Sequence, residues 1–387
     1  MYGASAATLE AGRSVGTVTR VSGLRCGAFV LCALAVLGSC AGDDDETGAP
    51  PTSAPRSKTT VSPTTTTIPT TTTTRGPRGS GEPVTLAFAG DTHFEGELES
   101  QLANNPEGML APIAPVLSQA DLAIVNLETA ITERGTPEAK AFNFRAPATA
   151  LTAVASAGID VVSMANNHGV DYGPVGLLDS LAAKNDSGFP IVGIGANAAE
   201  AYAPYTTDIK GQRIAIIGAT QVLDDSLINS WTATDDHAGI ASAKEVERLV
   251  QSVRDARAAS DTVVVFLHWG TERQTCPSAS QEELAQQLAD AGADLIVGGH
   301  AHRVQGAGRL GAAFVAYGLG NFIWYADPGP SAETGVLLVT VAGREIDSYE
   351  WVPAQISNGV PRPLEGDAAA TARTSWDGLR GCTNLTP

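Results

Sequence analysis

The chain has 387 residues, of which 42 are acidic and 24 basic, with six histidines and five cysteines. Its length allows one large domain or two ordinary ones, and an apolar fraction of 43% is enough for a packed core, which excludes wholesale disorder. A formal net charge of −18 argues against a nucleic-acid partner, because such proteins need a basic surface. Five cysteines are too few for a disulfide-dense scaffold.

Residues 1–40 are typical of a secretion signal. Three arginines precede an apolar run from Cys26 to Cys40, and these 15 residues are too few to cross a bilayer, which takes about 20. The run ends in Leu37-Gly38-Ser39-Cys40, which resembles the lipobox of bacterial lipoproteins, whose cysteine is lipidated and becomes the mature N-terminus. We therefore predict a lipid anchor at Cys40 that holds the chain at the extracytoplasmic face of the cell membrane. An ordinary cleaved signal and an uncleaved membrane anchor are the alternatives.

Removal of this signal changes the charge and the set of cysteines. The mature chain would keep 21 basic and 41 acidic residues, a net charge of −20. With Cys40 lipidated and Cys26 and Cys32 removed, Cys276 and Cys382 would remain. In an oxidising exterior these two could pair, or they could stay as isolated thiols, and the sequence leaves both possibilities open.

Residues 41–82 are predicted to be a disordered tether rich in Thr and Pro. From Thr59 to Thr74, 11 of 16 residues are Thr, and the segment lacks the apolar content that folding requires. It could serve as a spacer that lifts the following domain away from the membrane, or it could be a passive tail.

Residues 83–387 alternate between apolar, β-prone runs and helical patterns without a Pro/Gly-rich break, which indicates a single α/β domain. The strands predicted to be buried on both faces are Val84–Ala89, Leu122–Asn126, Val161–Met164, Ile191–Ile194, Arg213–Ala219, Thr262–His268 and Leu295–Val297. The predicted helices are Pro112–Gln119, Ala148–Ala157, Pro174–Lys184, Ala243–Ala258 and Glu282–Ala291. Three consecutive strands, expected to be antiparallel, follow at Ala312–Tyr317, Gly335–Val341 and Glu345–Val352.

Polar residues gather where these strands end, and five of the six histidines lie there. The segments are Gly90–His93, Asn126–Glu128, Ala165–His168, His268–Gly270 and Gly299–His302. Ligands of open α/β sheets bind beyond the carboxyl ends of the strands. Imidazole combined with carboxylate and amide oxygen suits Zn, Mn or Fe, so this placement predicts a divalent metal site.

The order of the motifs, D-x-H, an acidic residue, N-H, a further His and then G-H-x-H, resembles the calcineurin-like metallophosphoesterase superfamily. Within it, the chain resembles the CapA (poly-γ-glutamate capsule synthesis) family over roughly residues 84–325. The segments that carry this resemblance are Asn126–Thr129, Ala165–Gly173, His268–Glu272, Gly299–His302 and Gly318–Phe322. It implies a sandwich of two mixed β-sheets flanked by helices (αββα).

The resemblance also implies a two-metal scheme. The ligands of one metal would be Asp91, His93 and His302, and those of the second Asn167, His268 and His300. Glu128 stands where the superfamily has a bridging Asp, and His168 corresponds to a catalytic, non-ligand histidine that assists the transition-state charge and the leaving group. Because Glu is one methylene longer than Asp, the occupancy of the second metal site stays open.

Other polar residues are further candidates. Arg145 and Arg303 could bind a carboxylate or phosphate of the substrate, or could be surface arginines. Asp171 and Glu272 lie close to candidate ligands and could accept hydrogen bonds that orient imidazoles, or could simply be solvated. His237 lies outside every motif and is predicted to be a surface residue.

Three functions are compatible with these features. The first is a surface-anchored, metal-dependent hydrolase acting on an anionic capsule or cell-wall polymer such as poly-γ-glutamate. The second is a non-catalytic assembly or export factor that binds polymer in the same cleft, and the third is a phosphoesterase. A mature charge near −20 opposes a polyanionic partner at long range, although bound dications and Arg145 could invert the local sign.

Overall fold

The computed structural model describes residues 79–325 and 329–387. The predicted secretion signal, the predicted lipidation site Cys40 and tether residues 41–78 lie outside the described residues. Within the described ranges, none of the helices combines the length and the apolar character needed to span a bilayer.

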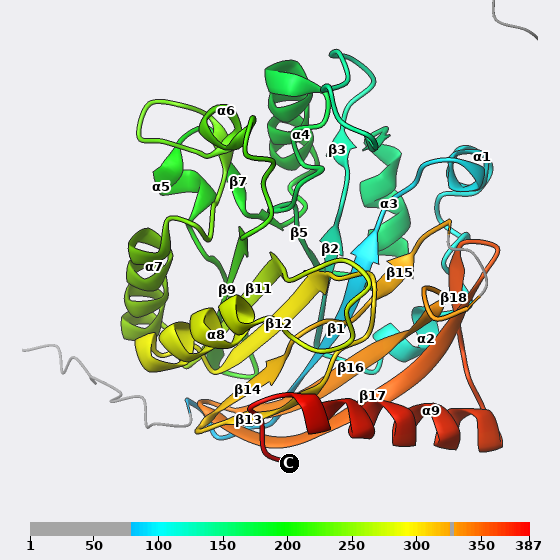
Figure 1. Cartoon of the computed structure of the whole chain (residues 1–387), viewed down its shortest axis with the longest axis vertical. Helices are drawn as coiled ribbons and strands as arrows, with labels where there is room; N and C mark the ends of the chain where they lie inside the picture. The colour runs from blue at the N-terminus through cyan, green and yellow to red at the C-terminus, as the bar shows by residue number, and fades with distance from the viewer. Residues whose placement is uncertain (1–78, 326–328) are drawn as a thin grey trace, which may run out of the picture. The chain divides into compact units, whose positions relative to one another are not determined.

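The first sheet has eight strands, ordered β18-β17-β16-β1-β2-β5-β6, with β15 paired to β1 as well (Figure 1). The four strands β1, β2, β5 and β6 run parallel, whereas β16, β17 and β18 continue the sheet as an antiparallel meander. Their bounds are β1 Val84–Thr92, β2 Leu122–Leu127, β5 Val161–Ser163, β6 Ile191–Val192, β15 Asn321–Ile323, β16 Glu333–Ala342, β17 Glu345–Ser357 and β18 Val360–Pro363.

The second sheet has six strands, ordered β13-β14-β12-β11-β9-β8. Its four central strands are parallel and its two edge strands antiparallel. The bounds are β8 Tyr205–Ile209, β9 Gln212–Thr220, β11 Thr262–Trp269, β12 Leu295–His300, β13 Ala307–Leu310 and β14 Ala313–Ala316. Two short pairs, β3 (Ala130–Ile131) with β4 (Arg145–Ala146) and β7 (Ile194–Gly195) with β10 (Gly239–Ile240), stand apart from both sheets.

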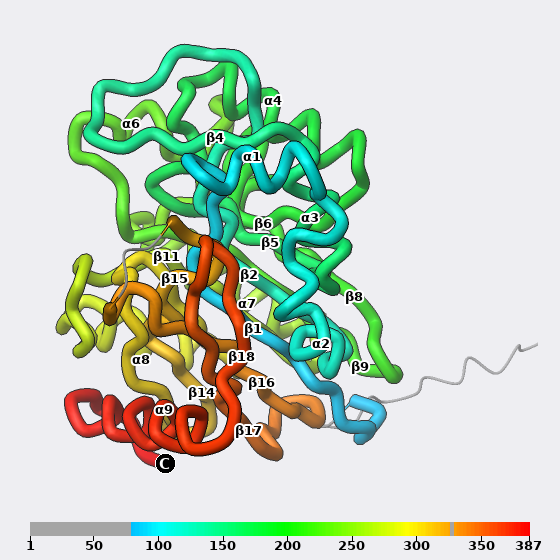
Figure 2. The backbone as a smooth tube through the Cα atoms, turned by 90° about the vertical axis from the view of Figure 1, so that its right-hand side faces the viewer, coloured from blue at the N-terminus to red at the C-terminus, as the bar shows by residue number. Residues whose placement is uncertain are grey.

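Helices cover the outer faces of the two sheets. The helices are α1 Glu97–Asn104, α2 Ala114–Leu117, α3 Thr149–Ser156, α4 Gly173–Ser187, α5 Ala198–Ala201, α6 Ile228–Trp231, α7 Val246–Ala259, α8 Ala279–Ala291 and α9 Gly366–Leu379, followed by the 3-10 turn Arg380–Cys382. Side chains from α1, α2, α3 and α4 pack on the first sheet, and those from α7 and α8 pack on the second. Figures 1 and 2 show where the backbones of these helices run. A third apolar cluster joins both sheets, with Phe88 from β1 and Phe266 from β11 fully buried in it. This layering confirms the predicted αββα sandwich.

Local sequence explains why these helices form. In α7, Leu249, Val253 and Ala256 recur at helical spacing and are the buried residues of that helix. Helix α8 begins with a capping box between Ser278 and Gln281, which satisfies two backbone N–H groups at its N-terminus.

The structure corrects one prediction about the tail. Gly335–Val341 and Glu345–Val352 are neighbouring antiparallel strands, but Ala312–Tyr317 is not their partner. Its strand, β14, lies in the second sheet, parallel to β12. The prediction assumed that strands consecutive in the sequence are neighbours in one sheet. Instead, β14 belongs to the second sheet, and the chain then returns to the first sheet at β15 and β16. Helices α1, α5, α6 and α9 and strands β3, β4, β8, β10, β13, β15 and β18 were not predicted.

The last residues of the predicted tether contact the second sheet. The Ser80 hydroxyl donates to the Lys210 carbonyl in the β8–β9 turn (2.5 Å), and the Gln212 side chain donates to the Glu82 carbonyl. The boundary at residue 82 stays a prediction, but Ser80 and Glu82 are held against the domain.

Candidate metal centre

Parallel strands of both sheets end at one place and bring the predicted ligand residues together. Asp91 lies near the end of β1, Glu128 directly follows β2, and His268 and His300 lie at the ends of β11 and β12. The alignment of Asp91 with Asn126 and of Trp269 with His300 shows that these strand ends are level within each sheet. Residues far apart in the sequence therefore meet at one edge of the sandwich, as the motifs predicted.

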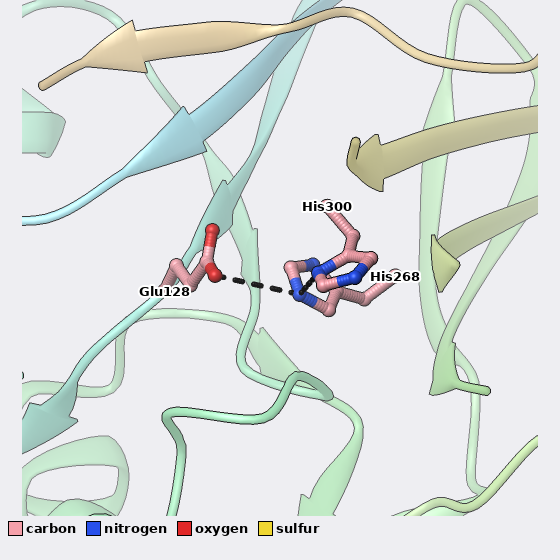
Figure 3. Close-up of side chains that lie close together, drawn as sticks. All are labelled: Glu128, His268 and His300. Carbon is pink, nitrogen blue, oxygen red and sulfur yellow. Dashed lines mark hydrogen bonds and ion pairs between the residues drawn. The ribbon is translucent and has the colours of Figure 1, made fainter. Parts of the chain in front are cut away.

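Two groups of side chains in this cluster could hold a metal ion. One consists of Glu128, His268 and His300, and the other of Asp91, Glu128 and His302, with the ligand atoms of each group within 4.8 Å of one another. Figure 3 shows the Glu128 carboxylate pointing toward His268, whose Nε2 lies 3.4 Å from Glu128 Oε1 and 3.1 Å from His300 Nδ1. Glu128 belongs to both groups, which is the position of a bridging ligand.

The environment of Glu128 fits a bound cation. The side chain is fully buried, and neither carboxylate oxygen has a hydrogen-bond partner among the residues that the structure describes. Burial raises the pKa of Glu128 well above its usual value, and the nearby Asp91 carboxylate adds to this rise. An unpartnered buried carboxylate is costly in a folded protein unless a cation compensates it.

Asp91 is held in place from three directions. Its Oδ1 accepts a hydrogen bond from Asn126 Nδ2 (2.8 Å), and its Oδ2 accepts one from the His300 backbone N–H (2.9 Å). His302 Nδ1 lies 3.3 Å from the same Oδ2. Gly299 makes this approach possible, because a Cβ at that position would come within 2.2 Å of the Asp91 carboxylate.

His93 also presents an unpartnered ring nitrogen. Its Nδ1 accepts a hydrogen bond from the Glu95 backbone N–H (3.0 Å), so the neutral ring carries its proton on Nε2. This Nε2 is buried and has no hydrogen-bond partner within the described part of the chain. Phe144 stacks on the His93 ring at 4.6 Å, and the Trp324 ring meets it edge-on at 4.1 Å. These contacts fix the plane of the ring, and a metal bound at Nε2 would take the place of that proton.

The loop Asn166–His168 contributes one predicted ligand and the predicted catalytic histidine. Asn167 Oδ1 lies 2.6 Å from His268 Nε2. His168 Nδ1 lies 2.5 Å from Asp171 Oδ2, and His168 Nε2 faces Glu128 Oε1 at 3.8 Å. Asp171 therefore orients His168, as one of the two alternatives for this residue predicted.

Burial keeps four imidazoles of the cluster neutral. It lowers the pKa of His93, His168 and His268 well below the usual value, and it lowers that of His300 to about 3, with the neighbouring His302 as a further cause. A metal ligand must be a neutral imidazole, so these environments suit metal binding near pH 7.

Two of the candidate ligand histidines have an uncommon backbone conformation. His300 has φ of 85° and His302 has φ of 50°, in the left-handed region that non-glycine residues rarely occupy. Such conformations cluster at functional sites, where surrounding contacts hold them. Here the Asp91 bond to the His300 N–H and the Asn321 bond to His302 Nδ1 (2.8 Å) supply those contacts.

Three predicted site residues lie outside this cluster. The Arg145 guanidinium stacks over the Tyr172 ring at 4.8 Å, and the Arg145 backbone N–H donates to Glu95. Arg303 donates to the Ser331 hydroxyl (3.0 Å) and lines a separate cavity. Glu272 is exposed and makes no hydrogen bond to an imidazole of the described residues, which matches the solvated alternative for this residue. His237 is exposed, as expected.

Lys140 and two asparagines support the cluster and were missed as site residues. Lys140 Nζ lies 2.7 Å from Asp171 Oδ1, donates to the Asn167 carbonyl and lies 3.5 Å from His168 Nδ1. Asn166 Nδ2 donates to Asn126 Oδ1 (3.0 Å), which links the loop to the Asp91 side chain. The asparagines stood in quoted motifs and could have been found there, whereas no local pattern marks Lys140.

Cys276 and Cys382 form a disulfide, with their Cα atoms 5.7 Å apart. Of the two possibilities that the sequence left open, the structure contains the paired one. The bond joins the loop that follows His268 to the chain end that follows α9.

The fold and the cluster define a class of protein: an αββα sandwich with Asp, Glu, Asn and His side chains gathered at the strand ends as candidate metal ligands. The chain belongs to the bacterial capsule synthesis protein family PGA_cap, whose family model matches residues 85–326. This confirms the family resemblance of the motifs.

Two curated relatives cover most of the chain. The capsule biosynthesis protein CapA of Bacillus anthracis is 29% identical over 294 residues, which are 73% of this chain and 70% of that protein. The PGA biosynthesis protein CapA of Bacillus subtilis (strain 168) is 25% identical over 293 residues, 75% of this chain and 76% of the relative. Among solved structures, a novel phosphatase from Mycoplasma pneumoniae has a TM-score of 0.46 at 13% identity, covering 71% and 94% of the two chains, which is too distant to indicate function.

Proposed function

We propose that the chain is a metal-dependent hydrolase that takes part in the synthesis or processing of an anionic capsule or cell-wall polymer. The observation that carries this proposal is Glu128, a fully buried carboxylate without a hydrogen-bond partner among the described residues and shared by two groups of candidate ligands. A merely structural cluster would satisfy such a carboxylate with protein donors.

The residues proposed to hold the metal fall into two sets around Glu128. One set is Asp91, His93 and His302, and the other is Asn167, His268 and His300. Their mixture of imidazole, carboxylate and amide oxygen suits Mn, Zn or Fe. A bound divalent ion would supply Lewis acidity and lower the pKa of a coordinated water.

His168 is the proposed catalytic residue. Asp171 accepts a hydrogen bond from its Nδ1, which places the ring proton there and leaves Nε2 directed at the cluster, 3.8 Å from Glu128 Oε1. At that position Nε2 can accept a proton and return it to the leaving group of a bound substrate. Lys140 secures Asp171 from its other oxygen, so the imidazole has one orientation.

The substrate class rests on the family and on the names of the relatives. Both Bacillus proteins are named for capsule or PGA biosynthesis. The net charge of −18 opposes a polyanion at long range, but salt screens this repulsion beyond about 8–10 Å. Cations bound at the centre, together with Lys140 and Arg145, would reverse the sign close to the site.

We further propose that a lipid on Cys40 anchors the chain at the extracytoplasmic face of the membrane. The lipobox-like sequence supports this location, and so does the Cys276–Cys382 bond, because disulfides persist in oxidising compartments. Replacement of Cys40 by Ser should release the protein from washed membranes into the soluble fraction. An unchanged membrane fraction would contradict the anchor.

The hydrolase proposal is tested on the full chain, stripped with a chelator and reloaded with Mn, Zn or Fe. We expect one or two ions per chain and cleavage of poly-γ-glutamate only in the reloaded protein. His168→Ala should keep the metal and lose about 10²–10⁴-fold in turnover, the usual contribution of general acid–base catalysis. His237→Ala, which changes an exposed histidine, should keep both properties.

Other outcomes select other functions. A chain that takes up no metal after reloading would overturn the metal-dependent proposal. Metal and polymer binding without turnover, unchanged in His168→Ala, would identify an assembly or export factor. Turnover of a bis-aryl phosphate alone would identify a phosphoesterase.

A further inference from the structure

A second cavity, separate from the metal centre, lies between helix α9 and the first sheet. Its volume is about 540 Å³, within the range of small-molecule sites. Residues of β16, β17, α9 and the segment after β12 line it, and α9 runs along β17 in Figure 1. Helix α9 lies beyond residues 85–326, so the family match does not include this wall.

The sequence of α9 explains why a cavity remains here. Four residues of the helix with short side chains line the cavity, Ala368, Thr371, Ala372 and Ser375, at positions that recur on one helical face. Ala368, Thr371 and Ser375 are exposed and Ala372 is half-buried, whereas Ala369 and Trp376 are the buried residues of this helix, so the lined face is open to solvent. The lining extends from Asp367 to Leu379, which at ~1.5 Å per residue is about 18 Å of helix. The cavity is therefore an elongated trough.

The body of the trough is apolar. Val304, Trp351, Pro353 and Leu379 contribute to its lining, and Trp351 stacks on Trp376 with ring centroids 5.4 Å apart. The other apolar residues of the lining are mostly alanine, proline and leucine. An apolar chain would gain free energy by leaving water for such a surface.

Two buried polar atoms of the lining residues lack a hydrogen-bond partner among the described residues. Trp376 Nε1 and Thr334 Oγ1 are buried and have no hydrogen-bond partner among the described residues, although only 5% of Trp376 and 2% of Thr334 is exposed. Buried polar groups are normally satisfied, and an unsatisfied one calls for a partner that the protein does not supply. Both residues line the trough, but the two atoms themselves lie beneath its surface, so a guest with hydrogen-bonding atoms would reach them only after the lining shifts.

The charges of the lining select the kind of guest. Arg303 is the one cation among the lining residues, and among the described residues Ser331 is the one hydrogen-bond partner of its guanidinium. Glu333 and Asp367 are exposed residues of the same lining and would repel a ligand with many negative charges. One carboxylate joined to an apolar chain matches this arrangement.

We propose that the trough beneath α9 is a binding site for a small amphipathic monocarboxylate, whose acid group pairs with Arg303 and whose apolar chain lies between α9 and Trp351. The site does not depend on the proposed hydrolase function. A short series of hydrogen bonds nevertheless connects it to the metal centre. Arg303 donates to the Ser331 hydroxyl, and the Ser331 carbonyl accepts a hydrogen bond from Asn321 (3.0 Å). Asn321 in turn contacts His302 (2.8 Å).

Calorimetric titration of the purified full chain with decanoate, kept below its micelle concentration, tests the site. We expect saturable binding with one ligand per chain. Arg303→Gln should weaken binding about tenfold, since a charge-assisted hydrogen bond is lost. Arg254→Gln, which changes an exposed arginine on α7, should leave binding unchanged. Decanol should bind about tenfold more weakly than decanoate, and a glutamate tetramer should not compete.

Variants that fill the trough separate this site from carboxylate binding at the metal centre. Ala372→Leu and Ser375→Leu should each reduce decanoate binding at least tenfold, in metal-loaded and in stripped protein alike. Thermal unfolding of each variant shows whether it is folded, and the second variant serves if the first is not. Absence of saturable decanoate binding would overturn the proposal, and so would binding that Arg303→Gln and a folded trough-filling variant leave unchanged.

Discussion

Lys140 Nζ lies 2.7 Å from Asp171 Oδ1, and the two residues of this ion pair contact His168 and Asn167. Only 11% of the Lys140 side chain is exposed, and Asp171 is fully buried. The same ammonium group donates to the Asn167 carbonyl, so one lysine holds the loop that carries a candidate ligand and the proposed catalytic histidine. Four predictions concern this pair, the carboxylate at the centre, the buried imidazoles and the disulfide.

Removal of the Lys140 charge should destabilise the protein. We expect Lys140→Met to lower the free energy of unfolding by about 3 kcal/mol, because breaking a buried ion pair leaves an uncompensated charge on Asp171. Denaturant unfolding measures this. Lys184→Met, which breaks the more exposed pair of Lys184 with Glu200, should cost about 0.5 kcal/mol or less. Equal losses in the two variants would show that burial does not govern the strength of the Lys140 pair.

Glu128→Gln should change stability with opposite signs in stripped and metal-loaded protein. Burial raises the pKa of Glu128, so the folded state binds more protons than the unfolded state above pH 4.5 and loses stability as the pH rises. Without metal, the Glu128→Gln protein should therefore have a higher free energy of unfolding than wild type at pH 7.

With metal present, the order should reverse. A ligand at 100 times its Kd stabilises the folded state by about 2.7 kcal/mol, and Glu128→Gln should lose most of this gain. Glu272→Gln, at an exposed glutamate, should behave as wild type in both states. A stripped Glu128→Gln protein that is less stable than wild type would mean that the carboxylate has a partner in the fold.

The stripped protein should be acid-sensitive because of its buried imidazoles. The pKa of His300 is lowered from 6.5 to about 3, chiefly by burial, so the unfolded state binds a proton that the folded state does not. The contribution of His300 to stability is present above pH 6.5 and is lost as the pH falls toward about 3.

Substitution isolates this contribution. Between pH 6 and 4, the free energy of unfolding should fall less steeply for His300→Asn than for wild type. The two slopes should differ by about 1.4 kcal/mol per pH unit. His237→Asn, at an exposed histidine, should keep the wild-type slope. Parallel slopes for His300→Asn and wild type would contradict a neutral buried His300.

The disulfide should stabilise the domain mainly by restricting the unfolded chain. It closes a loop across a sequence separation of 106 residues, and we expect the double variant Cys276→Ser, Cys382→Ser to lose about 2–4 kcal/mol of unfolding free energy. A reductant should lower the free energy of unfolding of wild type to that of the double variant, and should leave the value of the double variant unchanged. Reductant sensitivity in the variant would point to another cause.

Most candidate ligand residues were predicted from the sequence, but Lys140, which supports the loop that carries two of the site residues, was not. Asp91, Glu128, His268 and His300 were identified because each lies at the end of an apolar strand, and strand ends of parallel sheets meet at one edge. Arg303 was expected at the substrate, yet it lines the trough beneath α9, because the direction of a side chain after the G-H-x-H turn is not a local property. Helix α9 itself escaped prediction because its small residues carry little apolar periodicity.

The amino-acid sequence by itself determined the alternation of strands and helices, the layered α/β class and the kinds of ligand atoms at the strand ends. These follow from hydrophobic runs and periodicity, which are local properties of the chain. Only the tertiary structure decided that Glu128 has no hydrogen-bond partner among the described residues, that Lys140 pairs with Asp171, and that Cys276 meets Cys382. Each of these depends on the register and packing of segments distant in sequence, which no local pattern encodes.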